Sequence, residues 1–166
     1  RPPSFANALV QNIGGGNTMV FNHTAKLLLQ EAGDKLDIPT HDWWAYQLIT
    51  GAGGVIHYDE SPHLLYRQHS SNLIGSNSGW LARFQRLRGT LRGDFKAWSR
   101  KNIEALDSVR HLLTLENQLI LDNFKHACNQ KSWKVVWSLR KAGVYRQTWL
   151  GNLSLILACL AKEGRR

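Results

Sequence analysis

The stretch Thr40-His41-Asp42-Trp43-Trp44 follows a proline-containing loop and leads into an apolar run that ends at Thr50. The pattern predicts a helix of roughly ten residues that opens at Asp42 and stops at the glycines beyond residue 50. Asp42 by itself is explained as a helix cap, because the helix dipole stabilises a carboxylate in the first turn. The two tryptophans allow a second interpretation, since aromatic rings beside a carboxylate are typical of a site that stacks a sugar. They fit a core equally well, because adjacent helical residues point in different directions.

Short elements separated by glycines surround this helix in the first half of the chain. Apolar runs at 18–21, 55–58 and 64–67 predict short strands, and residues 24–32 predict a helix that Gly33 ends. This order of strands and helices predicts an α/β fold with a mixed sheet.

The second half of the chain has a helical pattern from about Trp80 onward. Apolar residues recur at helical spacing over 80–92 and 95–113, and Thr114 is a plausible N-cap for a helix to about Asn129. Ser132 begins another helix that stops at Gly143, and 147–162 is the most apolar segment. We therefore divide the chain into residues 1–79, an α/β part, and residues 80–166, an all-α extension.

The net charge of the chain changes sign at the same boundary, between residues 79 and 80. Residues 1–79 carry four Lys or Arg against six Asp or Glu, whereas residues 80–166 carry seventeen against six, and the whole chain has a net charge of +9. The basic extension has three interpretations: a solvated charged face, a nucleic-acid site and a membrane surface. No nucleic-acid motif accompanies the charge, so we predict no nucleic-acid partner and favour an anionic membrane surface. The candidate basic residues are Arg83, Arg86, Lys96, Arg100, Lys101, Lys134, Arg140, Lys141 and Arg146.

Several classes of protein are excluded by the composition. No run of eighteen apolar residues exists, so no segment is expected to span a membrane. Cys128 and Cys159 lack metal-ligand spacing, which suits a reducing compartment. The glycines at 14–16 allow a ligand to approach the backbone closely, but the segment has neither the P-loop lysine nor the dinucleotide spacing. Tyr66-Arg67-Gln68-His69 collects polar groups where a predicted strand ends, a usual place for a ligand in α/β proteins.

Three motifs together resemble a known family. Gly-Gly-Asn-Thr before an apolar run, then His-Asp-Trp-Trp, then Tyr-Arg-Gln-His-x-x-Asn are similar to the C-terminal half of bacterial family 2 glycosyltransferases. The rhamnosyltransferase-like members, which build cell-surface polysaccharides, are the most similar, and the resemblance covers roughly residues 8–77. It implies that residues 1–79 are the acceptor-side part of a catalytic domain with the GT-A fold.

The resemblance also implies roles for individual residues. Asp42 matches the catalytic base of an inverting transfer, His41 precedes it, and His69 matches a histidine that helps to hold a divalent cation, Mg²⁺ or Mn²⁺, on the donor diphosphate. The positions that match the substrate site are Gly15, Gly16, Asn17, His41, Trp43, Trp44 and Arg67.

The Asp-x-Asp motif of the family's nucleotide-binding half has no counterpart in the chain. We therefore expect a fragment that neither turns over nor binds a cation tightly alone. The implied partners are a nucleoside-diphosphate-sugar donor, a saccharide or lipid-linked saccharide acceptor and an anionic membrane. The expected location is the cytoplasm, peripheral on the inner face of the cell membrane. The alternative is a non-catalytic adaptor whose basic helices recruit a membrane or an anionic partner.

Overall fold

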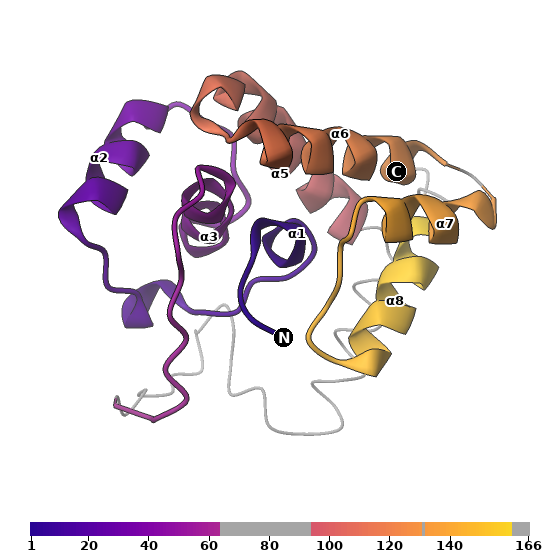
Figure 1. Ribbon diagram of the computed structural model, residues 1–166, viewed down its shortest axis with the longest axis horizontal. Helices are drawn as coiled ribbons and strands as arrows, with labels where there is room; N and C mark the ends of the chain where they lie inside the picture. The colour runs from indigo at the N-terminus through magenta and orange to yellow at the C-terminus, as the bar shows by residue number, and fades with distance from the viewer. Residues whose placement is uncertain (64–93, 131, 161–166) are drawn as a thin grey trace.

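The computed structural model describes residues 1–63, 94–130 and 132–160, and every regular element in these ranges is helical. Figure 1 shows α2 on the left, α1 and α3 in the centre, α5 and α6 along the top, and α7 and α8 on the right. The α-helices are α1 (Phe5–Ala8), α2 (His23–Ala32), α3 (His41–Gly51), α5 (Asp94–Ser108), α6 (Leu115–Asn129), α7 (Lys134–Lys141) and α8 (Trp149–Leu160); the 3₁₀ turns are η1 (Gly16–Thr18) and η2 (Arg110–Leu112).

The predicted α/β fold is wrong, because the described residues contain no strand. The segment predicted as a strand at 18–21 begins within η1 and continues as extended chain, with Met19 at φ −85° and ψ 133°. Val20 is 96% exposed, and Val55, in the second predicted strand, is 93% exposed. An extended segment becomes a strand only when a neighbouring segment supplies ladder hydrogen bonds, and no backbone hydrogen bond joins either run to another described segment. The third predicted strand, 64–67, lies outside the described residues.

Helix α3 is the centre of the fold, buried on all sides from Trp43 to Gly51. It packs against α1 and α2. The Trp43 indole N–H and the Gln47 amide both donate to the Ala8 carbonyl, at 2.6 and 3.1 Å. The Tyr46 hydroxyl donates to Asn7 Oδ1 at 2.8 Å, and burial raises the pKa of Tyr46 to about 12. Since buried polar groups are costly unless paired, these bonds fix how α1 sits on α3.

The C-terminus of α3 is capped by the second half of the chain. Asn117 donates from its amide nitrogen to the carbonyls of Thr50 and Gly51, at 3.1 and 2.9 Å, and the Thr114 N–H donates to the Gly51 carbonyl at 3.0 Å. Thr114 is also the N-cap of α6, as predicted, with its side chain accepting from the Asn117 N–H. The beginning of α6 thus satisfies the Gly51 carbonyl and adds a second donor to the Thr50 carbonyl, which also accepts the Gly53 N–H at 3.1 Å.

The helical character of the second half is confirmed wherever the structure describes it. Gly33 and Gly143, predicted as helix stops, follow α2 and α7 closely with φ values of 83° and 67°, a conformation that favours glycine. The buried core draws on both halves, from Phe5, Leu9 and Leu48 to Leu106, Phe124 and Leu155. The predicted boundary near Gly79 lies outside the described residues and stays a prediction.

Arg146 is half-buried, and its guanidinium is bonded to residues at the edge of this core. Its Nε donates to the Val10 carbonyl at 3.0 Å, and its Nη1 donates to Ser154 Oγ at 2.9 Å. The guanidinium carbon lies 4.9 Å from the centre of the Phe95 ring, and burial lowers the pKa of the group. Arg146 therefore joins the segment that follows α1 to α5 and α8, and we remove it from the set of predicted membrane-binding residues.

Candidate functional site

The glycine loop and the N-terminus of α3 meet, although twenty-four positions of sequence separate Gly16 from His41. A Cβ atom built on Gly16 would lie 2.3 Å from His41 Nε2, so only a residue without a side chain fits with the imidazole in this position. Gly15, Gly16, Asn17 and His41 are all exposed. The structure thus gathers at one surface the glycine loop and the start of the helix that carries Asp42.

Asp42 lies in the first turn of α3, one residue later than the helix start. The N-cap is Thr40, not Asp42, and its side chain makes no capping bond. Asp42 Oδ1 accepts the Trp43 N–H at 2.8 Å, whereas no described residue donates to Oδ2. The helix N-terminus therefore anchors one carboxylate oxygen, and the other oxygen is available to a ligand.

Trp43 and Trp44 contribute their rings to the core. Each is 5% exposed, and the Trp43 ring meets Trp98 edge to face with 6.2 Å between centroids. Flat stacking on a sugar requires an exposed ring face, and neither ring offers one here. Their predicted contact with substrate stays a prediction, while their role in packing is observed.

Arg67 and His69 lie outside the described residues, so their predicted roles stay predictions. Within the described ranges, no group of three or more His, Cys, Asp or Glu side chains is arranged to hold a metal ion. Burial raises the pKa of the Cys128 and Cys159 thiols, to about 12 and about 11, so both are protonated at neutral pH. The described residues therefore do not form a site for the divalent cation that the resemblance implies.

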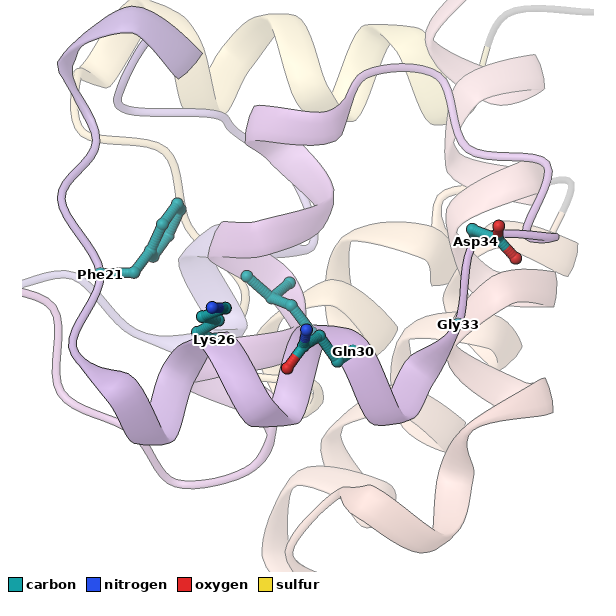
Figure 2. A pocket seen from close by; sticks show the side chains of 6 residues that line it. Phe21, Lys26, Gln30, Gly33 and Asp34 are labelled. Carbon is teal, nitrogen blue, oxygen red and sulfur yellow. The ribbon is translucent and has the colours of Figure 1, made fainter.

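Two cavities of the described part of the chain are not lined by Asp42. A depression of about 460 Å³ is bounded by Phe21 on one side and by α2 on the other, as Figure 2 shows with Lys26 and Gln30. A second cavity, of about 470 Å³, lies among α5, α6 and α8. None of the predicted site residues lines either of them. The candidate site is thus an exposed corner of the fold.

Thr18 is a residue of this corner that our sequence analysis missed. Its hydroxyl and its N–H both donate to the Gly15 carbonyl, at 2.8 and 2.9 Å, and so close the turn that brings Gly16 to His41. A threonine close after glycines is compatible with such a turn, because threonine hydroxyls bond to nearby backbone groups in turns. The turn was missed because Thr18 is also the first residue of the run at 18–21, which we interpreted as a strand.

Replacing Gly16 by alanine is expected to displace the His41 ring and leave the fold intact. The new methyl group collides only with the end of an exposed side chain, so the free energy of unfolding should change by less than about 1 kcal/mol. The proton resonances of the His41 ring, followed by NMR, should shift. Gly51→Ala is the contrast: its Cβ meets Leu113 Cδ2 at 2.7 Å in the core, and overpacking there costs about 1–3 kcal/mol. Unchanged His41 resonances in Gly16→Ala would contradict the contact.

Comparison with known proteins gives a partial match. The chain is similar to the dTDP-rhamnosyl transferase RfbG of Shigella flexneri, with 32% identity over 78 residues. The match covers 47% of this chain and only 26% of that protein, so the chain corresponds to about a quarter of its relative's length. No protein-family profile and no solved structure matches the chain. These findings indicate a glycosyltransferase-like relationship.

Proposed function

We propose that this chain is the acceptor-side part of an inverting glycosyltransferase that moves rhamnose or another deoxysugar from a nucleoside diphosphate to a saccharide during cell-surface polysaccharide synthesis. The similarity to a dTDP-rhamnosyl transferase supports sugar transfer as the reaction and suggests dTDP-rhamnose as the donor. The match spans a quarter of that relative, so the whole enzyme's activity is part of the proposal. Family 2 membership rests on the three sequence motifs.

The observation that carries the proposal is the corner where Gly16 touches His41 beside Asp42. A general base must reach the acceptor hydroxyl, and a carboxylate with one anchored oxygen and one available oxygen meets this requirement. The exposed glycines leave room for a sugar to approach the backbone. Residues that were far apart in the sequence thus form one surface of the right chemistry.

The proposed reaction is a single displacement. Asp42 Oδ2 accepts the proton of the acceptor hydroxyl as that oxygen forms a bond to the anomeric carbon of the donor. The bond from the anomeric carbon to the diphosphate breaks on the opposite face, and the nucleoside diphosphate leaves with the bonding electron pair. The sugar is transferred with inversion, and His41 is placed to donate a hydrogen bond to the acceptor or the donor.

His69 is the only residue of this chain that we propose as a ligand of a divalent cation on the donor diphosphate. A bound Mg²⁺ or Mn²⁺ supplies charge stabilisation to a leaving diphosphate. Since the described residues hold no set of metal ligands, no step above depends on the cation. Arg67 is proposed to bind the substrate on the same grounds as His69, from the motif that both share.

A chimaeric enzyme tests the proposal. The whole 166-residue chain should replace the aligned part of the Shigella relative, because α6 caps α3 and residues 1–79 alone would lose that support. We expect the chimaera to release dTDP from dTDP-rhamnose in the presence of the relative's acceptor, and the relative without its aligned part to release none. A folded chimaera that binds dTDP-rhamnose and does not turn it over would favour the non-catalytic adaptor.

The proposed location is the inner face of the cell membrane, where a lipid-linked acceptor and a soluble nucleotide sugar meet. Among the described residues, no helix is long and apolar enough to cross a bilayer. Peripheral binding is therefore the form of membrane association that we propose. Fractionation of cells that produce the tagged chain, with and without a high-salt wash of the membranes, tests it.

A further inference from the structure

Helix α7 has an exposed aromatic face as well as a buried one. Trp133, directly before the helix, is 75% exposed, and Trp137, four residues later on the same face, is 65% exposed. Val135 and Leu139 face the core from the other side of the helix. Two largely exposed tryptophans one turn apart are more apolar surface than a solvated helix needs.

Helix α8 also has one buried apolar face and one exposed apolar face, and the exposed face consists mainly of leucines. Its buried residues are Leu155, Ala158 and Cys159. Its exposed apolar residues fall within about 100° of the helix circumference, and the helix carries no charged side chain. These residues, which are between 42% and 75% exposed, are Trp149, Leu150, Leu153, Leu157 and Leu160. Since α7 packs against α8, at the right of Figure 1, both exposed rows belong to one end of the molecule.

All the Asp, Glu, Lys and Arg side chains on α7, on α8 and in the chain between them are Lys or Arg. Residues 123–162 contain no Asp or Glu at all. Lys134, Arg140 and Lys141 are exposed on α7, and Lys141 Nζ lies 5.9 Å from the centre of the Trp137 ring. Helical spacing places these three cations on the same side of α7 as its tryptophans. The surface therefore combines exposed tryptophans, exposed leucines and uncompensated positive charge.

We infer that this α7–α8 surface, formed by Trp133, Trp137, Trp149, Leu150, Leu153 and Leu157 with Lys134, Arg140 and Lys141, docks on an anionic lipid bilayer. Apolar faces rimmed by tryptophan and lysine lie in the headgroup region with their apolar side chains in the acyl boundary. Each lysine or arginine near an anionic surface adds about 1 kcal/mol, whereas a neutral surface gains nothing from it. Of the nine Lys and Arg residues that the sequence analysis proposed to bind a membrane, the inference retains three: Lys134, Arg140 and Lys141. It does not depend on whether the protein transfers sugar.

Vesicle sedimentation tests the inference on the full chain. The protein should sediment with phosphatidylcholine vesicles that contain 30% phosphatidylglycerol, and less with phosphatidylcholine alone. Lys134→Gln with Lys141→Gln should weaken the partition coefficient about 30-fold, from about 1 kcal/mol for each lysine. Trp133→Ser with Trp137→Ser should weaken it at least about tenfold, since both rings lose their apolar contact with lipid. Both pairs are exposed, so the far-UV circular dichroism and the melting temperature should stay the same.

Leu115→Ser with Leu119→Ser is the matched control. These leucines are 80% and 64% exposed on α6, so the control removes a similar exposed apolar pair outside the α7–α8 surface. It should bind vesicles like the parent chain. Absence of binding to anionic vesicles, or equal loss in the control and the tryptophan variant, would overturn the inference.

The chain could instead self-associate through this surface without binding vesicles. If that self-association depended on concentration and the tryptophan variant abolished it, the surface would be assigned to a second copy of the chain. Vesicle binding in a chimaera that transfers no sugar would leave this inference standing and remove the proposed function alone.

Discussion

Asp42→Asn is expected to lower rhamnose transfer by the chimaeric enzyme about 10²- to 10⁴-fold, because an amide cannot accept the proton of the acceptor hydroxyl. The substitution keeps the shape of the side chain, and the asparagine oxygen still accepts the Trp43 N–H that Asp42 Oδ1 holds at 2.8 Å. The loss should therefore appear in kcat and not in the free energy of unfolding. Initial rates of dTDP release at saturating donor and acceptor measure it.

Asp34→Asn is the matched control for this experiment. Asp34 is an exposed carboxylate in the loop after α2, in the same half of the chain. Its substitution should leave the rate within about twofold of the parent enzyme, as expected for a surface change away from the site. A near-normal rate in Asp42→Asn would remove Asp42 from the base role. An equal loss in both variants would show that the rate follows net charge and not one particular carboxylate.

Trp43→Ala is expected to lower the free energy of unfolding by about 3–5 kcal/mol, the usual cost of deleting a large core aromatic. The indole is 5% exposed, packs on Trp98 and donates to the Ala8 carbonyl at 2.6 Å. Its removal opens a cavity between α1 and α3 and removes one of the bonds that join them. Urea unfolding followed by far-UV circular dichroism measures the change, since tryptophan fluorescence would be altered by the substitution itself.

Two further variants, Trp133→Ala and Trp43→Phe, show how much of the loss in unfolding free energy comes from core packing and how much from the indole hydrogen bond. Trp133 is 75% exposed, so its loss should cost less than about 0.5 kcal/mol. Phenylalanine keeps most of the packing at position 43 and loses the indole N–H, so Trp43→Phe should cost about 0.5–1.5 kcal/mol for the hydrogen bond, in addition to a modest cost of repacking. If Trp43→Ala cost no more than Trp133→Ala, the ring would not belong to the core.

The helices were predictable because their causes are local. The start of α6 at Thr114 and the stops of α2 and α7 at Gly33 and Gly143 depend on side chains and backbone angles within one turn. The strands at 18–21 and 55–58 were predicted wrongly from equally local apolar runs. A strand exists only through hydrogen bonds to another segment, so the composition of Val20 and its neighbours cannot guarantee one.

The sequence named the residues of the candidate site, but it did not show that the glycine loop and the start of α3 lie next to each other. The sequence already marked Gly16, His41 and Asp42 as chemically unusual, but the contact between Gly16 and His41 depends on how α1, α2 and α3 pack. The same packing places both rings of Trp43 and Trp44 in the core, a role that the sequence alone could not assign, while their contact with substrate stays a prediction. Arg146, one of the nine basic residues that the sequence analysis assigned to a membrane surface, is half-buried and bonds to Val10 and Ser154.

The sequence by itself determined that residues 42–50 are helical with a carboxylate in the first turn, that the described part of the second half is helical, and that positive charge accumulates in that half. These properties follow from the order of neighbouring residues, because helix periodicity, caps and charge are all set within a few positions. Only the tertiary structure decided which helical faces are buried, that Gly16 meets His41, and that α7, with its exposed tryptophans, packs against α8, with its exposed leucine row. Such contacts join residues distant in the chain, and whether they form depends on the packing of the whole core.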